Sequence, residues 1–177
     1  MLEPLKHILQ ARRIILASSS PRRREVLENI ALALGKAKEV ADRIEFSPQN
    51  PGLIVGADTV VILDSKILGK PASKNIAKQM LQSFSGRSHF VYTGIALITA
   101  EKTVTFHEKT EVHMAELTEE VIDAYVNTGE PMDKAGGYGI QGVGGTLVRS
   151  VVGDYFNVVG FPLHRFCSAL VELYQQR

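Results

Sequence analysis

One segment constrains the fold more than any other. Residues 53–63 read Leu-Ile-Val-Gly-Ala-Asp-Thr-Val-Val-Ile-Leu and are apolar except at Asp58 and Thr59. The apolar residues are continuous and do not alternate with polar ones, as they would in a strand with one solvent-exposed face. This stretch is therefore typical of a buried strand. A strand of this kind needs other elements packed against it, which favours a layered domain.

Strands and helices alternate along the rest of the chain. We expect strands at residues 14–17, 53–63, 66–68, 90–99, 102–114 and 147–152. We expect helices at residues 21–44, 73–84, 118–129 and 162–174, with Ser20, Ser73 and Thr118 as N-caps. This order predicts an α/β layered domain with a mixed sheet. A chain of 177 residues fits one domain, so we expect residues 1–177 to form a single unit.

Charge and cysteine content exclude several classes of protein. Lys and Arg number 20 and Asp and Glu 19, a net charge of +1, which argues against a protein that grips nucleic acid by bulk charge. Cys167 is the sole cysteine, so an intrachain disulfide and a cysteine-cluster metal site are excluded, and we expect it to be buried. No apolar run reaches the roughly 18 residues of a membrane span, and residues 1–13 do not read as a signal peptide. We therefore expect a cytoplasmic protein without membrane or nucleic-acid partners.

Residues 18–24, Ser-Ser-Ser-Pro-Arg-Arg-Arg, follow one predicted strand and open a helix. Free N–H groups and the helix dipole favour an anion at such a point. Three arginines in a first turn oppose that dipole, and a bound phosphate would resolve the conflict because the planar guanidinium matches phosphate oxygens. The alternative is a solvated helix start in which arginine pairs with Glu25 or Glu28. The coincidence of strand, hydroxyls and arginines favours phosphate binding.

Two charged residues stand out near the buried strand. Asp58 is costly inside an apolar segment unless it is paired or metal-bound, so it could hold Mg²⁺, activate water, or be satisfied by backbone amides or a lysine. Lys70 lies between Gly69 and Pro71, where it could neutralise a phosphate or be a solvated turn residue. The sequence leaves these alternatives open.

Glycines crowd the segment that follows the 118–129 helix. Six of the chain's 15 glycines fall between Gly136 and Gly145, a density typical of a backbone that approaches a ligand closely. The spacing matches neither a Walker loop nor a dinucleotide fingerprint. Gln141 could read a base edge, and Tyr138 could stack on a ligand or pack in the core. Tyr138 and Ile140 anchor the segment, which argues against a mobile surface loop.

Three further polar residues are interpreted as structural. His89 has no second histidine at ligand spacing, so it is not expected to bind a metal. Asp154 and Asn157 are expected to cap turns.

Together these motifs resemble the Maf family of nucleoside triphosphate pyrophosphatases. The matching stretches follow the family's order and cover nearly the whole chain: residues 16–23, 56–61, 69–71, 81–94, 133–142 and 157–163. The resemblance implies a fold like that of Maf and inosine triphosphate pyrophosphatases, an α/β fold with a mixed twisted sheet flanked by helices and a smaller lobe. It also implies hydrolysis of a nucleoside triphosphate to monophosphate and pyrophosphate, a homodimer, and a divalent metal, Mg²⁺ or Mn²⁺.

The resemblance also implies roles for individual residues. Substrate binding would fall to Ser18, Arg22, Arg23 and Gln141. Catalysis would fall to Lys36, Asp58 and Lys70, with Asp58 holding the metal or activating water. The sequence Tyr-Gly-Ile-Gln at residues 138–141 resembles that of the branch acting on dTTP and UTP, and differs from that of the branch acting on 7-methyl-GTP.

One departure from the family pattern bears on activity. After the first helix the family carries a turn, a strand and a loop with an acidic metal ligand, whereas here residues 27–30 run directly into residues 31–36. A segment on the order of 30 residues is therefore expected to be absent near residues 29–31. If it is deleted, the metal site lacks a carboxylate, and the alternative function is a non-catalytic nucleotide-binding module that regulates cell division or a fused domain. A phosphatase or kinase is disfavoured because the chain has no P-loop or Cys-x5-Arg signature.

Overall fold

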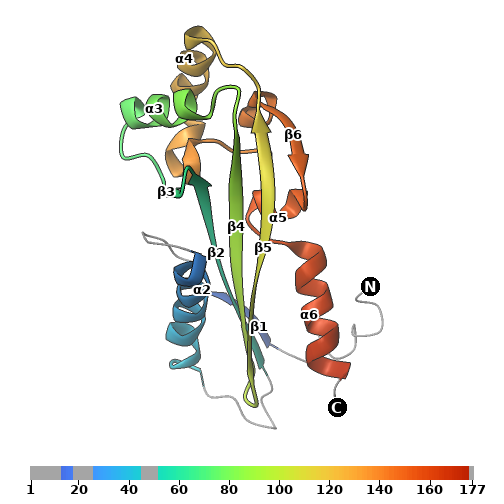
Figure 1. The fold of residues 1–177 in the computed structure, drawn as a ribbon. Coiled ribbons are helices and arrows are strands. Elements are labelled where there is room, and N and C mark those ends of the chain that lie inside the picture. The colour runs from blue at the N-terminus through green and yellow to red at the C-terminus, as the bar shows by residue number, and fades with distance from the viewer. Residues whose placement is uncertain (1–12, 18–25, 45–51, 176–177) are drawn as a thin grey trace.

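A mixed sheet forms the centre of the fold in a computed structural model that describes residues 13–17, 26–44 and 52–175. Its six strands within these ranges are β1 (Arg13–Ala17), β2 (Gly52–Leu63), β3 (Lys66–Leu68), β4 (Ser88–Ile98), β5 (Thr103–Met114) and β6 (Val148–Val152). The order is β1-β2-β4-β5-β6, with β3 paired to the end of β2 (Figure 1). β1 runs parallel to β2, and the remaining pairs are antiparallel. The mixed sheet predicted from the sequence is confirmed.

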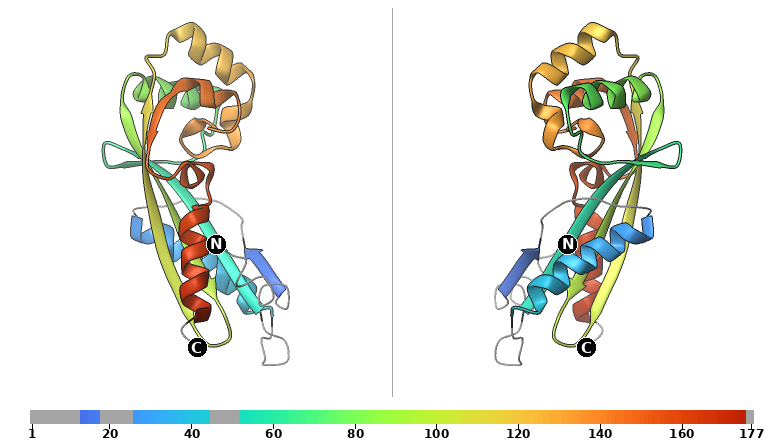
Figure 2. Two further views of the ribbon diagram at one scale, coloured as in Figure 1. Left: turned by 90° about the vertical axis from the view of Figure 1, so that its right-hand side faces the viewer. Right: turned by 90° about the vertical axis from the view of Figure 1, so that its left-hand side faces the viewer.

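The apolar strand β2 is buried on both faces, as its composition predicts. Leu53 and Ile54 are inaccessible to solvent although they point to opposite faces. Ile54 packs with Ala33 and Ala37 of α2 (Val26–Ala41). Leu53 packs with Leu170 of α6 (Leu163–Gln175), so the two helices cover opposite faces of this part of the sheet (Figure 2).

A smaller lobe lies at the other end of the sheet. It contains α3 (Lys74–Phe84), α4 (Glu119–Asn127) and three 3₁₀ turns, η2 (Glu130–Asp133), η3 (Ala135–Gly137) and η4 (Val143–Leu147). The N-caps predicted at Ser73 and Thr118 are confirmed, because Ser73 accepts a hydrogen bond from the Ile76 amide and Thr118 accepts one from the Val121 amide. The third predicted N-cap, Ser20, lies outside the described residues. The lobe has its own apolar core around Phe84, and this core continues onto the sheet.

Two helical elements depart from the expectation. The long helix predicted for residues 21–44 is α2, Val26–Ala41, within the described residues, and it runs without a break across residues 29–31. A short helix, α5 (Tyr155–Val159), was not predicted; Asp154 caps its N-terminus by accepting from the Phe156 amide. Within residues 13–17, 26–44 and 52–175, every helix falls short of the length and apolar character that crossing a bilayer requires.

Candidate active site

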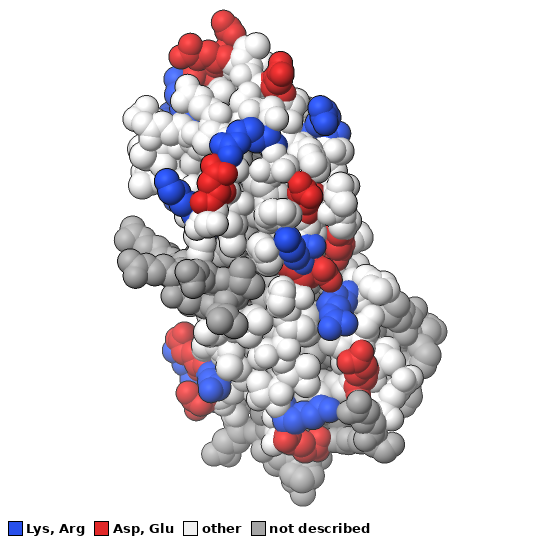
Figure 3. Space-filling model, viewed as in Figure 1, with Lys and Arg blue, Asp and Glu red and all other residues white. Residues whose placement is uncertain are grey.

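A cavity of about 750 Å³ opens between β2, the glycine-rich segment and the C-terminal end of α5. Seven residues were expected from the sequence to bind substrate or take part in catalysis, and four of them line this cavity: Lys36, Asp58, Lys70 and Gln141. The other three, Ser18, Arg22 and Arg23, lie outside the described residues. On the face drawn in Figure 3 acidic and basic side chains are interspersed, which agrees with the near-zero net charge.

Lys36 and Asp58 form an ion pair in the cavity wall. The ammonium group of Lys36 donates to Asp58 Oδ1 and, at 3.3 Å, to the carbonyl oxygen of Ala57. The two side chains are only 14% and 11% exposed. Of the alternatives that the sequence left open for Asp58, a neighbouring lysine is therefore the partner in this structure, and the carboxylate is compensated by an opposite charge where water is scarce.

Gly56 brings the two members of this pair together. A Cβ at Gly56 would lie 2.0 Å from the carbonyl oxygen of Ala33, so a side chain there would push α2 away from β2. Lys36 follows Ala33 by three residues and so lies on the same face of α2, one turn further on. The absence of a side chain at Gly56 thus sets the distance from which Lys36 reaches Asp58, a role that the sequence did not reveal.

Lys70 is tied to the glycine-rich segment through its own neighbour. The carbonyl of Gly69 accepts a hydrogen bond from the Gly136 amide at 3.0 Å. Lys70 is exposed at the cavity wall, a position that fits both a phosphate contact and a solvated turn residue.

Asp133 and Lys134 also line this cavity and were not assigned a role from the sequence. Lys134 Nζ contacts Asp133 Oδ1 at 2.6 Å, and this hydrogen bond lowers the pKa of Asp133, with a smaller contribution from the charge of Lys70. Their position directly before the glycine cluster is the sequence signal that could have pointed to them.

Tyr138 packs in the core of the lobe and also forms part of the cavity lining. Its hydroxyl lies 2.7 Å from His89 Nε2, and both rings are buried beside Phe84. Burial, with a smaller effect of His113, lowers the pKa of His89 to about 4, so the ring is neutral at pH 7. His89 therefore anchors the glycine-rich segment.

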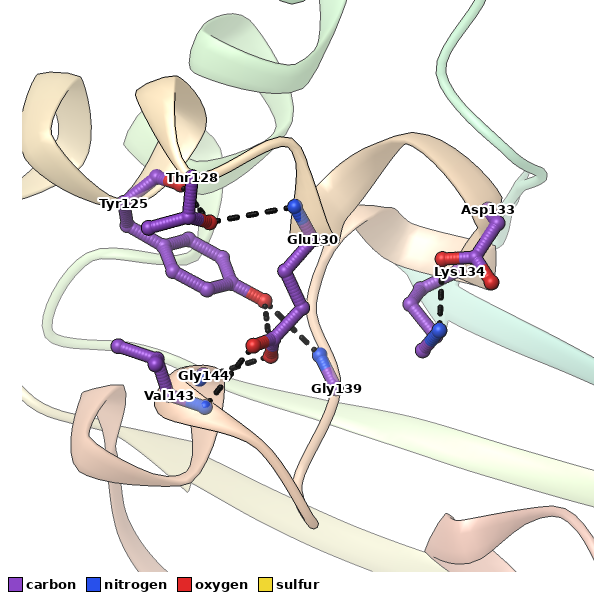
Figure 4. A network of polar contacts seen from close by, with 8 residues as sticks. All are labelled: Tyr125, Thr128, Glu130, Asp133, Lys134, Gly139, Val143 and Gly144. Atoms are coloured by element: carbon purple, nitrogen blue, oxygen red, sulfur yellow. Dashed lines mark hydrogen bonds and ion pairs between the residues drawn. The ribbon is translucent and has the colours of Figure 1, made fainter.

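Glu130 and Tyr125 hold the far part of the same segment (Figure 4). Glu130 Oε2 accepts from the Val143 amide at 2.9 Å, and Oε1 accepts from the Gly144 amide at 3.0 Å and from the Tyr125 hydroxyl at 2.9 Å. The Tyr125 hydroxyl in turn accepts from the Gly139 amide at 3.0 Å. We call these two side chains and three amides the Glu130 network; no motif in the sequence indicated it.

The opposite wall depends on Asn157. Its side-chain nitrogen donates to the Val91 carbonyl at 3.0 Å and to Thr110 Oγ1 at 2.9 Å. Its main-chain carbonyl oxygen accepts a hydrogen bond from Thr93 Oγ1 at 3.1 Å. Asn157 is fully buried inside α5 and its side chain bonds to two strands, so the expectation that it caps a turn is wrong. It fixes the start of the stretch 158–160, which lines the cavity.

The donors available to a metal were tested on the described residues. In residues 13–17, 26–44 and 52–175 there is no group of three or more His, Cys, Asp or Glu side chains that could hold an ion. Asp58 offers a carboxylate at the cavity wall. Mg²⁺ commonly binds through one or two carboxylates and the phosphates of its substrate, so the site fits an ion that enters with a nucleotide.

Comparison with known sequences places these features in a wider context. The profile of the family described as "Maf-like protein" matches residues 28–173. A protein of Bacillus anthracis (strain CDC 684 / NRRL 3495) named dTTP/UTP pyrophosphatase is 47% identical over 187 residues, covering 91% of this chain and 95% of its own length. Proteins of the same name from Bacillus cytotoxicus and Bacillus cereus (strain B4264) are 48% and 46% identical with the same coverage.

The alignment to these relatives is longer than the chain itself. Its 187 positions exceed the 177 residues present here, so the relatives carry residues that have no counterpart in this chain.

Proposed function

The chain belongs to the Maf family, and on this premise we propose that it hydrolyses nucleoside triphosphates, dTTP and UTP in particular, to the monophosphate and pyrophosphate. The observation that carries the proposal is that one cavity joins the Lys36–Asp58 pair to Lys70 and Gln141. Its volume of about 750 Å³ lies within the range of sites that enclose small ligands.

The reaction needs charge neutralisation and a positioned water more than covalent chemistry. Water attacks the α-phosphorus, a new P–O bond forms, and the bond from that phosphorus to the α,β-bridging oxygen breaks, so pyrophosphate leaves. Asp58 accepts the proton of the attacking water, and Lys36 holds the carboxylate in place. Lys70 neutralises the triphosphate, and we assign the same role to Ser18, Arg22 and Arg23 from the family resemblance.

A divalent cation, Mg²⁺ or Mn²⁺, is part of this proposal. Asp58 would hold it together with the phosphate oxygens, and the bound ion would supply positive charge to the developing transition state. Its use is supported by the family and by the carboxylate at the cavity wall.

Gln141 is proposed to select the base. Its side-chain amide offers both donors and an acceptor, which can pair with the alternating carbonyl and N–H groups on the edge of thymine or uracil. Cytosine presents an amino group in place of one carbonyl, so we expect CTP to be a poorer substrate.

Four finer points complete the proposal: assembly, location, domain extent and branch of the family. We propose a homodimer acting in the cytoplasm, with residues 1–177 as a single catalytic domain. The wording of residues 129–141 is similar to the Maf-like domain of acetylserotonin O-methyltransferase-like protein, and we propose an affiliation with that branch. Reading the transcript beyond the codon for Arg177 for a methyltransferase domain tests that affiliation.

A product assay tests the proposed function. The purified protein is incubated with dTTP, UTP, CTP, ATP, GTP and 7-methyl-GTP, with Mg²⁺ and then Mn²⁺, and pyrophosphate and orthophosphate are quantified separately. Pyrophosphate from dTTP and UTP supports the proposal. Orthophosphate would indicate a phosphatase, and nucleotide binding without any product would indicate a regulatory binding module.

A further inference from the structure

We propose that Glu130 and Tyr125 are positioning residues for base selection, and that they act by fixing the main chain on both sides of Gln141. This inference rests on the proposed function for the identity of the ligand. It concerns two side chains to which the sequence assigned no role. Glu130 also lines the cavity, but both of its carboxylate oxygens accept hydrogen bonds from the protein itself.

The chemistry of the Glu130 network requires a carboxylate. Three donors converge on the two carboxylate oxygens: the amides of Val143 and Gly144 and the hydroxyl of Tyr125. The hydrogen bonds from Gly144, Tyr125 and Val143, with the charge of Lys134, outweigh the effect of burial and lower the pKa of Glu130. A glutamine has one acceptor oxygen, so its NH₂ group would face at least one of these donors.

The main chain closes tightly around this carboxylate. A Cβ at Gly142 would lie 2.5 Å from Glu130 Oε2, and a Cβ at Gly144 would lie 2.5 Å from the Tyr125 hydroxyl oxygen. The glycines and the acidic side chain therefore fit one another, and the path of residues 139–144 follows the position of the Glu130 carboxylate.

Gln141 lies between the two points of attachment. Gly139 is held on one side by Tyr125, and Val143 is held on the other by Glu130 (Figure 4). Within the described part of the chain Gln141 has no hydrogen-bond partner of its own, and it is exposed at the cavity wall. The main chain alone therefore aims its amide, whereas the carboxylate oxygens of Glu130 are already occupied by protein donors.

The role predicts a distinct kinetic pattern. Misplacing Gln141 weakens recognition of the base but leaves the Lys36–Asp58 pair, on other elements, in place. We expect Glu130→Gln to raise KM for UTP by about tenfold, the effect of one lost charge-assisted hydrogen bond, and to reduce the preference for UTP over CTP. We expect kcat to change by less than about twofold, because the reacting end is untouched.

The experiment compares Glu130→Gln and Tyr125→Phe with a control, Glu119→Gln, in the exposed first turn of α4. For each variant kcat and KM are measured for UTP and CTP, and hydrogen exchange is followed in peptides covering residues 139–147. The proposal expects faster exchange in both network variants and wild-type exchange in the control. Tyr125→Phe keeps the buried ring and removes only the hydroxyl, so it provides the test if Glu130→Gln does not fold.

The double variant adds a second criterion. Because both side chains act on one segment, the effect of Tyr125→Phe with Glu130→Gln on KM should be less than the product of the single effects. Unchanged exchange over residues 139–147 in both network variants, or a loss of kcat with unchanged KM, would overturn the inference.

The exchange measurement also separates this inference from the proposed function. If the wild type releases no pyrophosphate, the proposed hydrolysis fails. In that case faster exchange together with weaker UTP binding in the network variants would still support positioning, and unaltered UTP binding would refute it.

Discussion

Lys36 and Asp58 form a largely buried ion pair that joins α2 to the centre of the sheet at the wall of the candidate site. The pair links α2, which follows β1 in the chain, to β2, the next described strand. It also defines the first prediction, because one member is the proposed base.

Asp58→Asn is expected to lower kcat for UTP by at least about 100-fold, the usual contribution of a general base. Folding should be retained, since the amide oxygen of asparagine can still accept a hydrogen bond from Lys36. Pyrophosphate release and thermal melting are measured side by side, with Asp123→Asn on α4 as the matched control. Near-normal turnover in Asp58→Asn would remove Asp58 from the reaction.

Gly56→Ala should reduce the free energy of unfolding by about 1–3 kcal/mol, because the new methyl group meets the Ala33 carbonyl and forces α2 from the sheet. Gly35→Ala is the matched control, because Gly35 lies on α2 itself and an added Cβ there would have nothing within 4 Å. Removing a helical glycine there should raise the free energy of unfolding by about 0.5–1 kcal/mol. Urea unfolding of both variants measures the contrast, and equal effects would contradict the close approach at Gly56.

Lys70→Ala is expected to weaken binding of a non-hydrolysable UTP analogue by about tenfold or more, because a charge-assisted contact to phosphate is lost. Lys66→Ala, on the same hairpin but outside the cavity lining, should bind like the wild type. Titration calorimetry gives both dissociation constants. An equal loss of affinity in the two variants would show that Lys70 contributes only to the overall positive charge and makes no specific contact with the phosphates.

The buried histidine predicts a pH dependence of stability. The pKa of His89 is about 4 in the folded protein and 6.5 for the free side chain, so the unfolded chain binds the extra proton between these values. Its contribution to stability is present above pH 6.5 and is lost as pH falls toward 4, by at most about 3 kcal/mol.

Unfolding of the wild type at pH 7 and pH 5 tests this dependence against His89→Gln. The glutamine variant should lose less stability on acidification, because no imidazole remains to be protonated. The exposed His107→Gln variant serves as control and should behave like the wild type. An equal loss of stability in all three proteins would show that His89 is not the group responsible.

The sequence predicted those parts of the fold whose signals are local. The apolar run around Asp58 indicated the buried strand, and Ser73 and Thr118 marked two helix starts, because capping depends on neighbouring residues only. α5 was missed because a five-residue helix is too short to show helical periodicity.

Features that depend on distant residues could not be read in the same way. Gly56 looks like any glycine in a strand until α2 is placed against it, and Glu130 looks like a surface acid until residues 139–144 fold around its carboxylate. The role expected for Lys36 came from family resemblance alone, whereas Asp58, Lys70 and Gln141 were also singled out from the residues around them. The structure adds that all four line one cavity. Asn157 was misjudged because its three hydrogen-bond partners lie on strands far away in the sequence.

The attachment of residues 139–144 to Glu130, rather than to β2 or α2, has a consequence for how this protein can evolve. The Lys36–Asp58 pair and the segment bearing Gln141 share no hydrogen bond among the described residues. Substitutions at residues 140, 141 and 143 can therefore accumulate and be selected for a new base while the hydrolytic end is inherited unaltered. Replacing Gly142 or Gly144 would bring a side chain against Glu130 or Tyr125. Tolerated substitutions in this pocket are therefore limited to the few positions between its glycines.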